Sequence, residues 1–261
     1  MAVVLRIPAA ATDEEALGLL VEAGATEVEV DGPDLLGLFP HGAQALPPEL
    51  AGARFEPAVL VDWDSVWAAA LRPQVLGPLT LVPWDGRGTA PAAGPGRLVL
   101  EVGPAFGSAR HPSTRLCLRW LLDRPSTGEV LDLGAGNGVL ALAALALGAE
   151  RALAVETEPE ALAVAERNAL RAGLRDRLEL ARSLPPERRF HRVVANILAS
   201  PLIDLAPDLA RALGPGGELC VSGFGPSLRE DVARALRHAG LRVVGGEVEG
   251  DWCRLDAAAP W

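Results

Sequence analysis

The sequence predicts an α/β fold built on a doubly wound parallel sheet. Three observations predict it: an apolar segment ends in a glycine-rich turn, an alanine-rich apolar segment follows directly, and helix-like and strand-like segments alternate from there to residue 256. Strand, turn and helix in that order form the first unit of such a sheet. With 261 residues, the chain has room for this domain and a smaller companion.

The smaller companion is predicted to be an α+β domain at residues 1–54. Its helix begins at Thr12, where a threonine cap is followed three residues later by Glu15. A linker at residues 55–73 carries a short helix, on which Trp63, Trp67 and Leu71 share one face. Packing explains that face more simply than ligand binding. The other predicted elements are strands at residues 3–7, 28–30 and 35–39 and the helix body at residues 16–23.

The second domain, residues 74–261, carries the main sheet. Glycines at 173 and 240 end two of its helices. Its closing helix–strand–strand segment indicates one antiparallel strand near the sheet edge. The predicted strands are residues 79–82, 98–102, 129–133, 152–156, 178–181, 192–195, 218–222, 242–248 and 252–256. The predicted helices are residues 114–122, 139–147, 160–172, 203–213 and 227–239.

The charge balance is acidic and uneven. The net charge is −10, and residues 1–60 hold ten carboxylates against two arginines. We expect no nucleic-acid binding there, because a basic stripe is missing. An acidic region suits a basic protein partner, although solubility alone also explains it.

The sequence also indicates where the protein works. The longest apolar segments fall short of a membrane span of roughly 20 residues, and the start lacks the pattern of a signal peptide. The three cysteines form no Cys-x-x-Cys pair and are expected to be reduced and buried. We expect a cytoplasmic protein that binds neither a membrane nor a metal.

The glycine-rich turn is spaced Asp132-x-Gly134-x-Gly136-x-Gly138. Glycines let the backbone adopt positive φ and approach a ligand closely. A dinucleotide fingerprint places a diphosphate at the following helix N-terminus, but a carboxylate at Asp132 would repel it. It would attract an ammonium group instead. The pattern therefore favours a ligand with a nucleoside and a positively charged amino-acid end, which is S-adenosylmethionine, and so predicts a methyltransferase.

Two further side chains end strands of the predicted sheet. Glu156 follows Asp132 by 24 residues, where a carboxylate can accept hydrogen bonds from both ribose hydroxyls. Asn196 ends the fourth strand, and its amide oxygen can accept a hydrogen bond from a neutral amine and aim its lone pair at the methyl group. The simpler interpretation of Asn196 is a turn residue at a strand end.

These motifs resemble the bacterial ribosomal protein L-eleven methyltransferases, the PrmA family. The resemblance covers nearly the whole chain, and Asn-Ile stands where many amino-group methyltransferases carry Asn-Pro-Pro-Tyr. The segments that carry it are Asp62-Trp63 with Trp67, Leu71-Arg72-Pro73, Pro83-Trp84, residues 105–114, the Asp132 loop, residues 155–159, residues 195–198 and Gly250-Asp251-Trp252.

The resemblance implies a two-domain, S-adenosylmethionine-dependent protein-lysine methyltransferase with a ferredoxin-like N-terminal domain that binds the substrate. That substrate is the basic ribosomal protein L-eleven, methylated on lysine side chains and its N-terminal amine. The cofactor contacts carried over are Thr114, Gly136, Glu156 and Asn196. Phe106 and Gly107 belong to a loop expected to close over the methionine end of the cofactor. For His111 the resemblance favours a loop-ordering role over proton transfer.

Two positions depart from the family pattern. The family usually reads Gly-Thr-Gly-x-His where this chain has Gly107-Ser108-Ala109-Arg110-His111, so positive φ is restricted at Ala109 and the loop is expected to be reshaped. Glu156 stands where aspartate is usual. The alternatives are a paralogue acting on another protein or a small amine, an RNA methyltransferase, an NAD-dependent dehydrogenase, and a non-catalytic ribosome-assembly protein.

Overall fold

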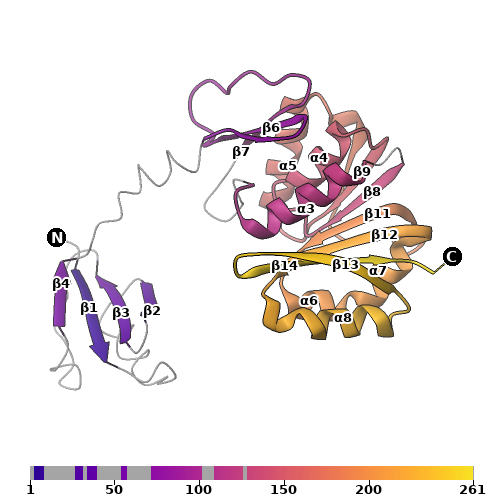
Figure 1. Ribbon diagram of the computed structural model, residues 1–261. Coiled ribbons are helices and arrows are strands. Elements are labelled where there is room, and N and C mark those ends of the chain that lie inside the picture. Colours follow the sequence, from indigo (N-terminus) through magenta and orange to yellow (C-terminus); the bar gives the residue numbers. More distant parts are fainter. Residues whose placement is uncertain are drawn as a thin grey trace. The chain divides into compact units, whose positions relative to one another are not determined.

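The computed structural model describes residues 3–8, 27–31, 34–39, 54–57, 72–101, 109–125 and 128–260. The chain divides into two compact units, residues 1–67 and 68–261 (Figure 1). Each unit is described by itself.

The first unit contains a four-stranded antiparallel sheet. Its strands are β1 (Val3–Pro8), β2 (Glu27–Asp31), β3 (Asp34–Phe39) and β4 (Arg54–Pro57), in the order β2-β3-β1-β4. This order, with every neighbouring pair antiparallel, fits the ferredoxin-like topology. The sequence missed β4. The predicted helix at residues 16–23 and nearly all of the predicted linker helix lie outside the described residues.

The second unit is built on a seven-stranded sheet with the order β10-β9-β8-β11-β12-β14-β13. Strands β8 to β12 are parallel, and β14 runs antiparallel to both of its neighbours, as predicted. The strands are β8 (Glu129–Leu133), β9 (Arg151–Val155), β10 (Leu178–Ala181), β11 (Phe190–Asn196), β12 (Leu213–Phe224), β13 (Arg242–Glu249) and β14 (Trp252–Ala258).

Helices cover both faces of this sheet (Figure 1). One layer holds α3 (Pro112–Asp123), α4 (Val139–Ala146) and α5 (Pro159–Ala172), and the other holds α6 (Ala199–Asp204), α7 (Ala206–Ala212) and α8 (Arg229–His238). Each layer has its own cluster of buried apolar side chains. The central strands are therefore apolar on both faces, which explains their nearly continuous apolar sequence.

Local sequence explains where these helices begin and end. Proline at the first turn starts α3 and α5, because a proline there loses no hydrogen bond. Gly173 ends α5 in the left-handed conformation. Within the described residues, no helix is both long and apolar enough to span a membrane.

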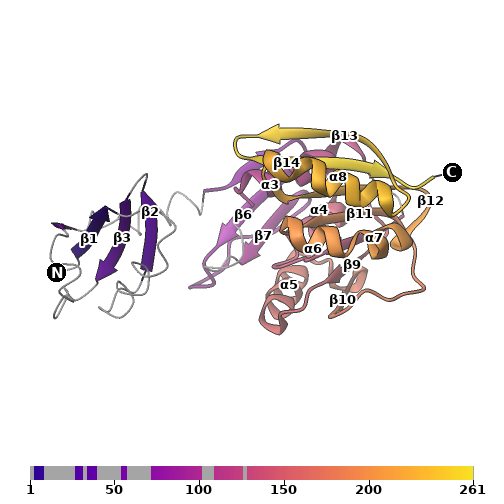
Figure 2. The ribbon, with the colours of Figure 1, turned by 90° about the horizontal axis from the view of Figure 1, so that it is seen from below.

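A separate three-stranded sheet precedes the main one in sequence. It consists of β5 (Gln74–Leu76), β6 (Leu79–Trp84) and β7 (Arg97–Glu101), and β7 packs against α5. Figure 2 shows β6 and β7 side by side. The sequence missed β5 and did not show that these strands form a sheet of their own.

The sequence was wrong about the helix at residues 203–213. The structure has two short helices there, because Pro207 cannot donate to the hydrogen-bond ladder and instead lies in the first turn of α7. The predicted helix at 227–239 begins with a short 3₁₀ turn, Pro226–Leu228, before α8. Residues 214–217, which separate the predicted helix at 203–213 from the predicted strand at 218–222, belong to β12, where the register with β11 is irregular.

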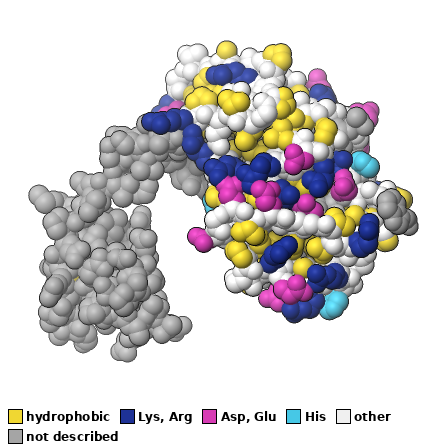
Figure 3. All heavy atoms as spheres, viewed as in Figure 1, with side chains coloured by type: hydrophobic (Ala, Val, Ile, Leu, Met, Phe, Trp, Pro, Cys, Tyr) yellow, Lys and Arg dark blue, Asp and Glu magenta, His cyan; other side chains and the backbone are white. Residues whose placement is uncertain are grey.

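Ion pairs join α3 to the last two strands. Figure 3 shows basic and acidic side chains side by side across this face, and the pairs include Arg115 with Glu249 and Arg119 with Glu247 and Glu249. Beneath them, Arg254 of β14 binds both carboxylate oxygens of Asp256, at 2.7 and 3.2 Å, and donates to the Leu116 carbonyl. The Arg254–Asp256 pair is buried within β14, and the bond from Arg254 to the Leu116 carbonyl anchors this strand to α3.

Removal of the Asp256 charge should destabilise the protein more than removal of a surface partner of the same arginine. We expect Asp256→Asn to lower the free energy of unfolding by about 3–5 kcal/mol, because it removes the charge of the buried carboxylate that binds two nitrogens of the buried Arg254 guanidinium. Glu247→Gln is the control: Glu247 also contacts Arg254 but its side chain is 43% exposed, so the loss should stay below about 1 kcal/mol. Urea unfolding measures both, and equal losses would contradict the assignment.

Candidate active site

The glycine turn lies between the end of β8 and the start of α4. Gly134, Gly136 and Gly138 all have positive φ, at 74°, 54° and 81°. The backbone N–H groups of Gly134 and Ala135 donate to the Val155 carbonyl at the end of β9, at 2.8 and 3.1 Å. The turn is thus held against β9, and the positive φ values are those that the glycine motif predicted.

Asp132 is buried beneath this turn. One of its oxygens, Oδ2, accepts from the backbone N–H of Ala141 at 2.9 Å, and so it caps α4 in place of Gly138, which has no side chain to do so. Within the described part of the chain, Oδ1 has no hydrogen-bond partner. Burial raises the pKa of the Asp132 carboxyl to about 7, and the charge of Glu156 adds to the rise.

Glu156 follows the last residue of β9. Its Oε2 accepts from the Gly136 N–H at 2.9 Å, and its Oε1 accepts from the N–H groups of Thr157 and Glu158 at 2.7 and 3.2 Å. The carboxylate therefore holds the glycine turn from the side of β9. Each carboxylate oxygen has two lone pairs, so Oε2 keeps one free for a further donor.

Asn196 is the last residue of β11. Its Nδ2 donates to the hydroxyl of Thr114 at 3.1 Å, and Thr114 is buried in the first turn of α3. This bond fixes the orientation of the amide. Among the described residues, the buried Oδ1 of Asn196 finds no hydrogen-bond partner. A buried acceptor without a donor is costly, and at a strand end it indicates a site for a ligand donor.

Ile197 packs between two glycines at this end of the sheet. A Cβ at Gly134 would overlap the Ile197 side chain, and a Cβ at Gly223 would overlap its backbone. Both glycines also have positive φ. Only glycine at these two positions lets the chain after Asn196 approach the ends of β8 and β12. The sequence singled out Gly134 but missed Gly223, whose signal was a lone glycine inside a strand.

The segment before α3 ends in an unusual conformation. Ala109 is fully buried with φ at 62°, and it is the one non-glycine residue with positive φ in the described part of the chain. The expected restriction was therefore wrong: Ala109 adopts the glycine-like φ despite its Cβ, at a cost of about 1–2 kcal/mol. Phe106 and Gly107 lie outside the described residues.

His111 contacts the first residue of β14. Its ring meets that of Trp252 edge-on at 4.3 Å, and its Nδ1 lies 2.7 Å from the Ser113 hydroxyl. Desolvation lowers the pKa of His111 and so favours the neutral ring. These contacts fit a role in ordering the start of α3.

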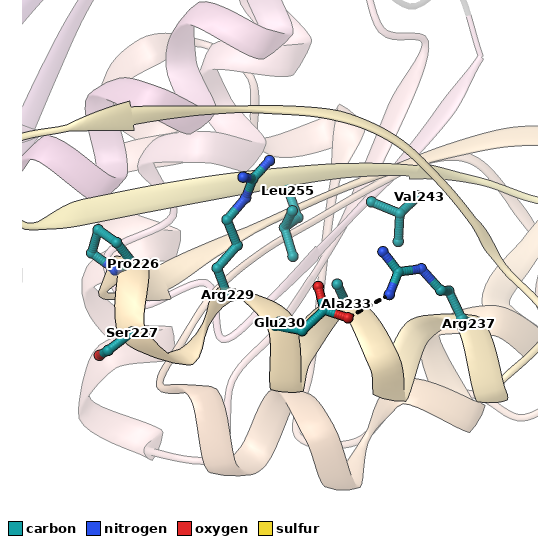
Figure 4. Close-up of a pocket in the computed structure, with 8 residues that line it drawn as sticks. All are labelled: Pro226, Ser227, Arg229, Glu230, Ala233, Arg237, Val243 and Leu255. Atoms are coloured by element: carbon teal, nitrogen blue, oxygen red, sulfur yellow. Dashed lines mark hydrogen bonds and ion pairs between the residues drawn. The ribbon is translucent and has the colours of Figure 1, made fainter.

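A pocket elsewhere on the unit contains none of the predicted site residues. It has a volume of about 320 Å³ and lies between α8 and the strands β13 and β14 (Figure 4). In Figure 4 the side chains of Arg229 and Arg237 reach from α8 toward the strands, and Arg237 pairs with Glu230 at 2.8 Å.

Sequence reasoning also missed how buried asparagines support the glycine turn. Asn137 is 2% exposed and Asn168 is fully buried. The Asn168 side chain binds the backbone of Asn137 and of Glu101, and the Asn137 side chain binds the backbone carbonyl of Glu101 at the end of β7. The signal for Asn137 was a polar residue inside the glycine motif. For Asn168 it was a polar residue on the apolar face of α5.

The strand order, the glycine turn after β8 and the acid after β9 define an S-adenosylmethionine-dependent methyltransferase. Comparison with known proteins gives the family. A family model described as Ribosomal protein L11 methyltransferase (PrmA) matches residues 49–260. The chain belongs to this family.

Individual proteins that carry the family's name are also similar to this chain. The Ribosomal protein L11 methyltransferase of Xylella fastidiosa is 44% identical over 237 residues, which cover 85% of this chain and 76% of that protein. The one of Azotobacter vinelandii is 42% identical over 201 residues, covering 75% and 67%. A crystal structure of ribosomal protein L11 methylase from Lactobacillus delbrueckii subsp. bulgaricus superposes with a TM-score of 0.62 at 26% identity, covering 72% of this chain and 97% of that chain.

The contact between Gly134 and Ile197 predicts a difference between two glycines. Gly134→Ala should lower the free energy of unfolding by about 2–4 kcal/mol, because it adds both left-handed strain and an overlap with Ile197. Gly173→Ala is the matched control, since Gly173 has a similar φ of +67° but nothing within 4 Å of the added Cβ. Its loss should be about 1 kcal/mol. Urea denaturation decides, and similar losses at both positions would show that the Ile197 contact is unimportant.

Proposed function

We propose that this protein transfers methyl groups from S-adenosylmethionine to the lysine side-chain and N-terminal amines of ribosomal protein L11. The observation that carries the proposal is the buried Oδ1 of Asn196, which has no hydrogen-bond partner among the described residues and stands at the carboxyl end of β11. Ligands of open α/β sheets bind at that end of the strands.

The residues present fit the cofactor. Within the described residues, two buried acceptors of the site lack partners, Asp132 Oδ1 and Asn196 Oδ1. Two amino groups would need acceptors at this site: the ammonium of the cofactor, which takes no part in the transfer, and the amine of the substrate, which receives the methyl group. We assign Asp132 to the former and Asn196 to the latter. Glu156 retains acceptor capacity for the ribose hydroxyls, while Gly134, Gly136 and Gly138 admit the ligand close to the backbone.

S-adenosylmethionine supplies an activated methyl group on a sulfonium, so the protein's task is to position the nucleophile. Asn196 Oδ1 accepts a hydrogen bond from the amine and so directs the lone pair of the nitrogen. Thr114 holds the amide by accepting from Nδ2. An amide oxygen takes no proton, so a lysine, with an unperturbed pKa of about 10.4, must reach Asn196 already neutral. Partial desolvation at the site lowers that pKa.

The two units divide the work in this proposal. Residues 1–54 bind the substrate protein, residues 55–73 link the units, and residues 74–261 bind the cofactor and catalyse transfer, with Phe106 and Gly107 closing over the methionine end. The excess of carboxylates in residues 1–60 suits a basic protein such as the named substrate of the relatives. Ala109 adopts a positive φ, the conformation that a glycine at this position of the family pattern would favour.

The test of the function is transfer of isotopically labelled methyl from S-adenosylmethionine to unmethylated large-subunit ribosomal proteins. Mass spectrometry then locates the label. Label on lysines or the N-terminal amine of L11 is the expected result. Cofactor binding with label on another protein, or on a small amine only, would replace the proposed substrate while keeping the chemistry.

Asn196 and Glu156 should affect different steps. We expect Asn196→Ala to lower kcat/KM for methyl transfer by about 100-fold or more, since the amine loses its alignment, while the cofactor Kd changes less than about threefold. Glu156→Ala should raise the cofactor Kd by about 10–100-fold, because hydrogen bonds to a charged acceptor are lost. Calorimetry and initial rates measure the two effects. Equal loss of affinity and rate in Asn196→Ala would refute the division of roles.

Cofactor binding should release a proton from Asp132. With its pKa at about 7, the carboxyl is partly protonated at neutral pH, and an ammonium beside it lowers that pKa, so the proton leaves. Binding enthalpies measured in phosphate and in Tris at pH 7 should therefore differ, and the difference should become smaller in Asp132→Asn. The same difference in Asp132→Asn at pH 7 would assign the proton to another group.

A further inference from the structure

Asn168 is a buried side chain that touches none of the residues proposed to bind the cofactor. It lies on α5 with no exposed surface. Its Oδ1 accepts from the backbone N–H of Glu101 at 2.7 Å and from Arg171 at 2.9 Å. Its Nδ2 donates to the backbone carbonyl of Asn137 at 3.0 Å. One amide therefore joins three segments that are distant in sequence.

Asn137, in the glycine turn, also binds the backbone of Glu101. It stands between Gly136 and Gly138, and its Nδ2 donates to the backbone carbonyl of Glu101 at 3.3 Å. The N–H and C=O of Glu101 are thus both bound by side-chain amides, one from α5 and one from the turn. Glu101 is the last residue of β7, an edge strand of the small sheet.

The carboxylate of Glu101 is fixed as well. Arg167 binds it through two nitrogens, at 2.6 and 3.0 Å, and Arg171 adds a bond at 3.3 Å. The guanidinium of Arg171 lies 4.5 Å from the centre of the Trp84 ring. The hydrogen bonds from Arg167 hold the pKa of Glu101 below its usual value. The end of β7 is therefore bound to α5 through both backbone and side chain.

The two segments joined here flank the proposed cofactor site. The glycine turn forms one part of it, and the end of β7 is bound to Asn137 within that turn. A shift of either segment relative to the other would change the space for the cofactor. The buried amide of Asn168 has little conformational freedom, because the two groups that donate to it and the carbonyl that accepts from it are in fixed positions.

We propose that Asn168 is a positioning residue of the cofactor site: with Asn137, it holds the glycine turn against the end of β7. This inference rests on the proposed assignment of the glycine turn to cofactor binding. Asn168 acts through the backbone of Asn137 and Glu101 and does not contact the cofactor.

Asn168→Asp tests the link selectively. The carboxylate can still accept from the Glu101 N–H and from Arg171, but it cannot donate to the Asn137 carbonyl. The connection of α5 to β7 is kept, and the connection to the glycine turn is lost. Glu166→Gln is the matched control. Glu166 lies on the same helix as Asn168, and the variant removes the charge from its 2.8 Å ion pair with Arg175, which lies beyond α5, while it leaves the amides unchanged.

We expect Asn168→Asp to raise the Kd for S-adenosylmethionine, measured by calorimetry, about 5–30-fold. Hydrogen exchange at residues 134–138 should become faster in the cofactor-free protein. At saturating cofactor, kcat should fall less than about threefold. Glu166→Gln should change the Kd less than twofold. A Kd within twofold of the wild type, together with unchanged exchange at the turn, would overturn the inference.

A second variant tests the same inference if Asn168→Asp does not fold. Asn137→Ala removes the other amide bond to Glu101, and it should likewise raise the Kd and speed exchange at the turn; unchanged values would overturn the inference. In the double variant, the rise in Kd should be smaller than the product of the two single effects. If the wild type fails to bind S-adenosylmethionine, the proposed cofactor site is wrong, while exchange in the cofactor-free variants still decides whether Asn168 holds the turn.

Discussion

The active end of this sheet depends on the space around Ile197. Gly134 follows β8, Gly223 lies near the end of β12, and neither position leaves room for a Cβ beside Ile197. Because of this, the chain can pass directly from Asn196 into the space between the two strand ends. Asn196 then stands next to the glycine turn, and its amide reaches Thr114 on α3. Larger residues at either position would move these groups apart.

Most of the polar side chains at the buried strand ends form hydrogen bonds with the backbone, and few of their atoms are left for a ligand. Asp132 caps α4, Glu156 holds the Gly136 N–H, and Asn168 binds Glu101 and Asn137. Each of these bonds satisfies a backbone group that would otherwise be costly to bury. In the described residues, the buried acceptors of the site that have no partner at all are the second oxygen of Asp132 and the amide oxygen of Asn196. The same side chains therefore shape the turn and define where amino groups can bind.

The start of α3 shows how packing overrides a local preference. Ala109 keeps a positive φ although an alanine disfavours it, and its methyl group is fully buried in the core on that side of the sheet. Burial of the methyl offsets part of the strain. The Trp252 ring contacts His111, the residue before α3, and ion pairs join α3 to β13. The start of α3, which carries Thr114, is therefore fixed by the burial of Ala109 before it and by its contacts with Trp252 and β13.

The sequence by itself determined the doubly wound sheet, its antiparallel strand, the glycine turn with Asp132, and the polar strand ends at Glu156 and Asn196. These are local: strand, turn and helix patterns and cap residues act over a few positions. Tertiary structure decided the rest. The contacts of Gly223 with Ile197 and of Asn168 with Asn137 join residues far apart in the chain, so no local pattern contains them. The short strands β4 and β5 are defined by their partners, and the φ of Ala109 by its burial.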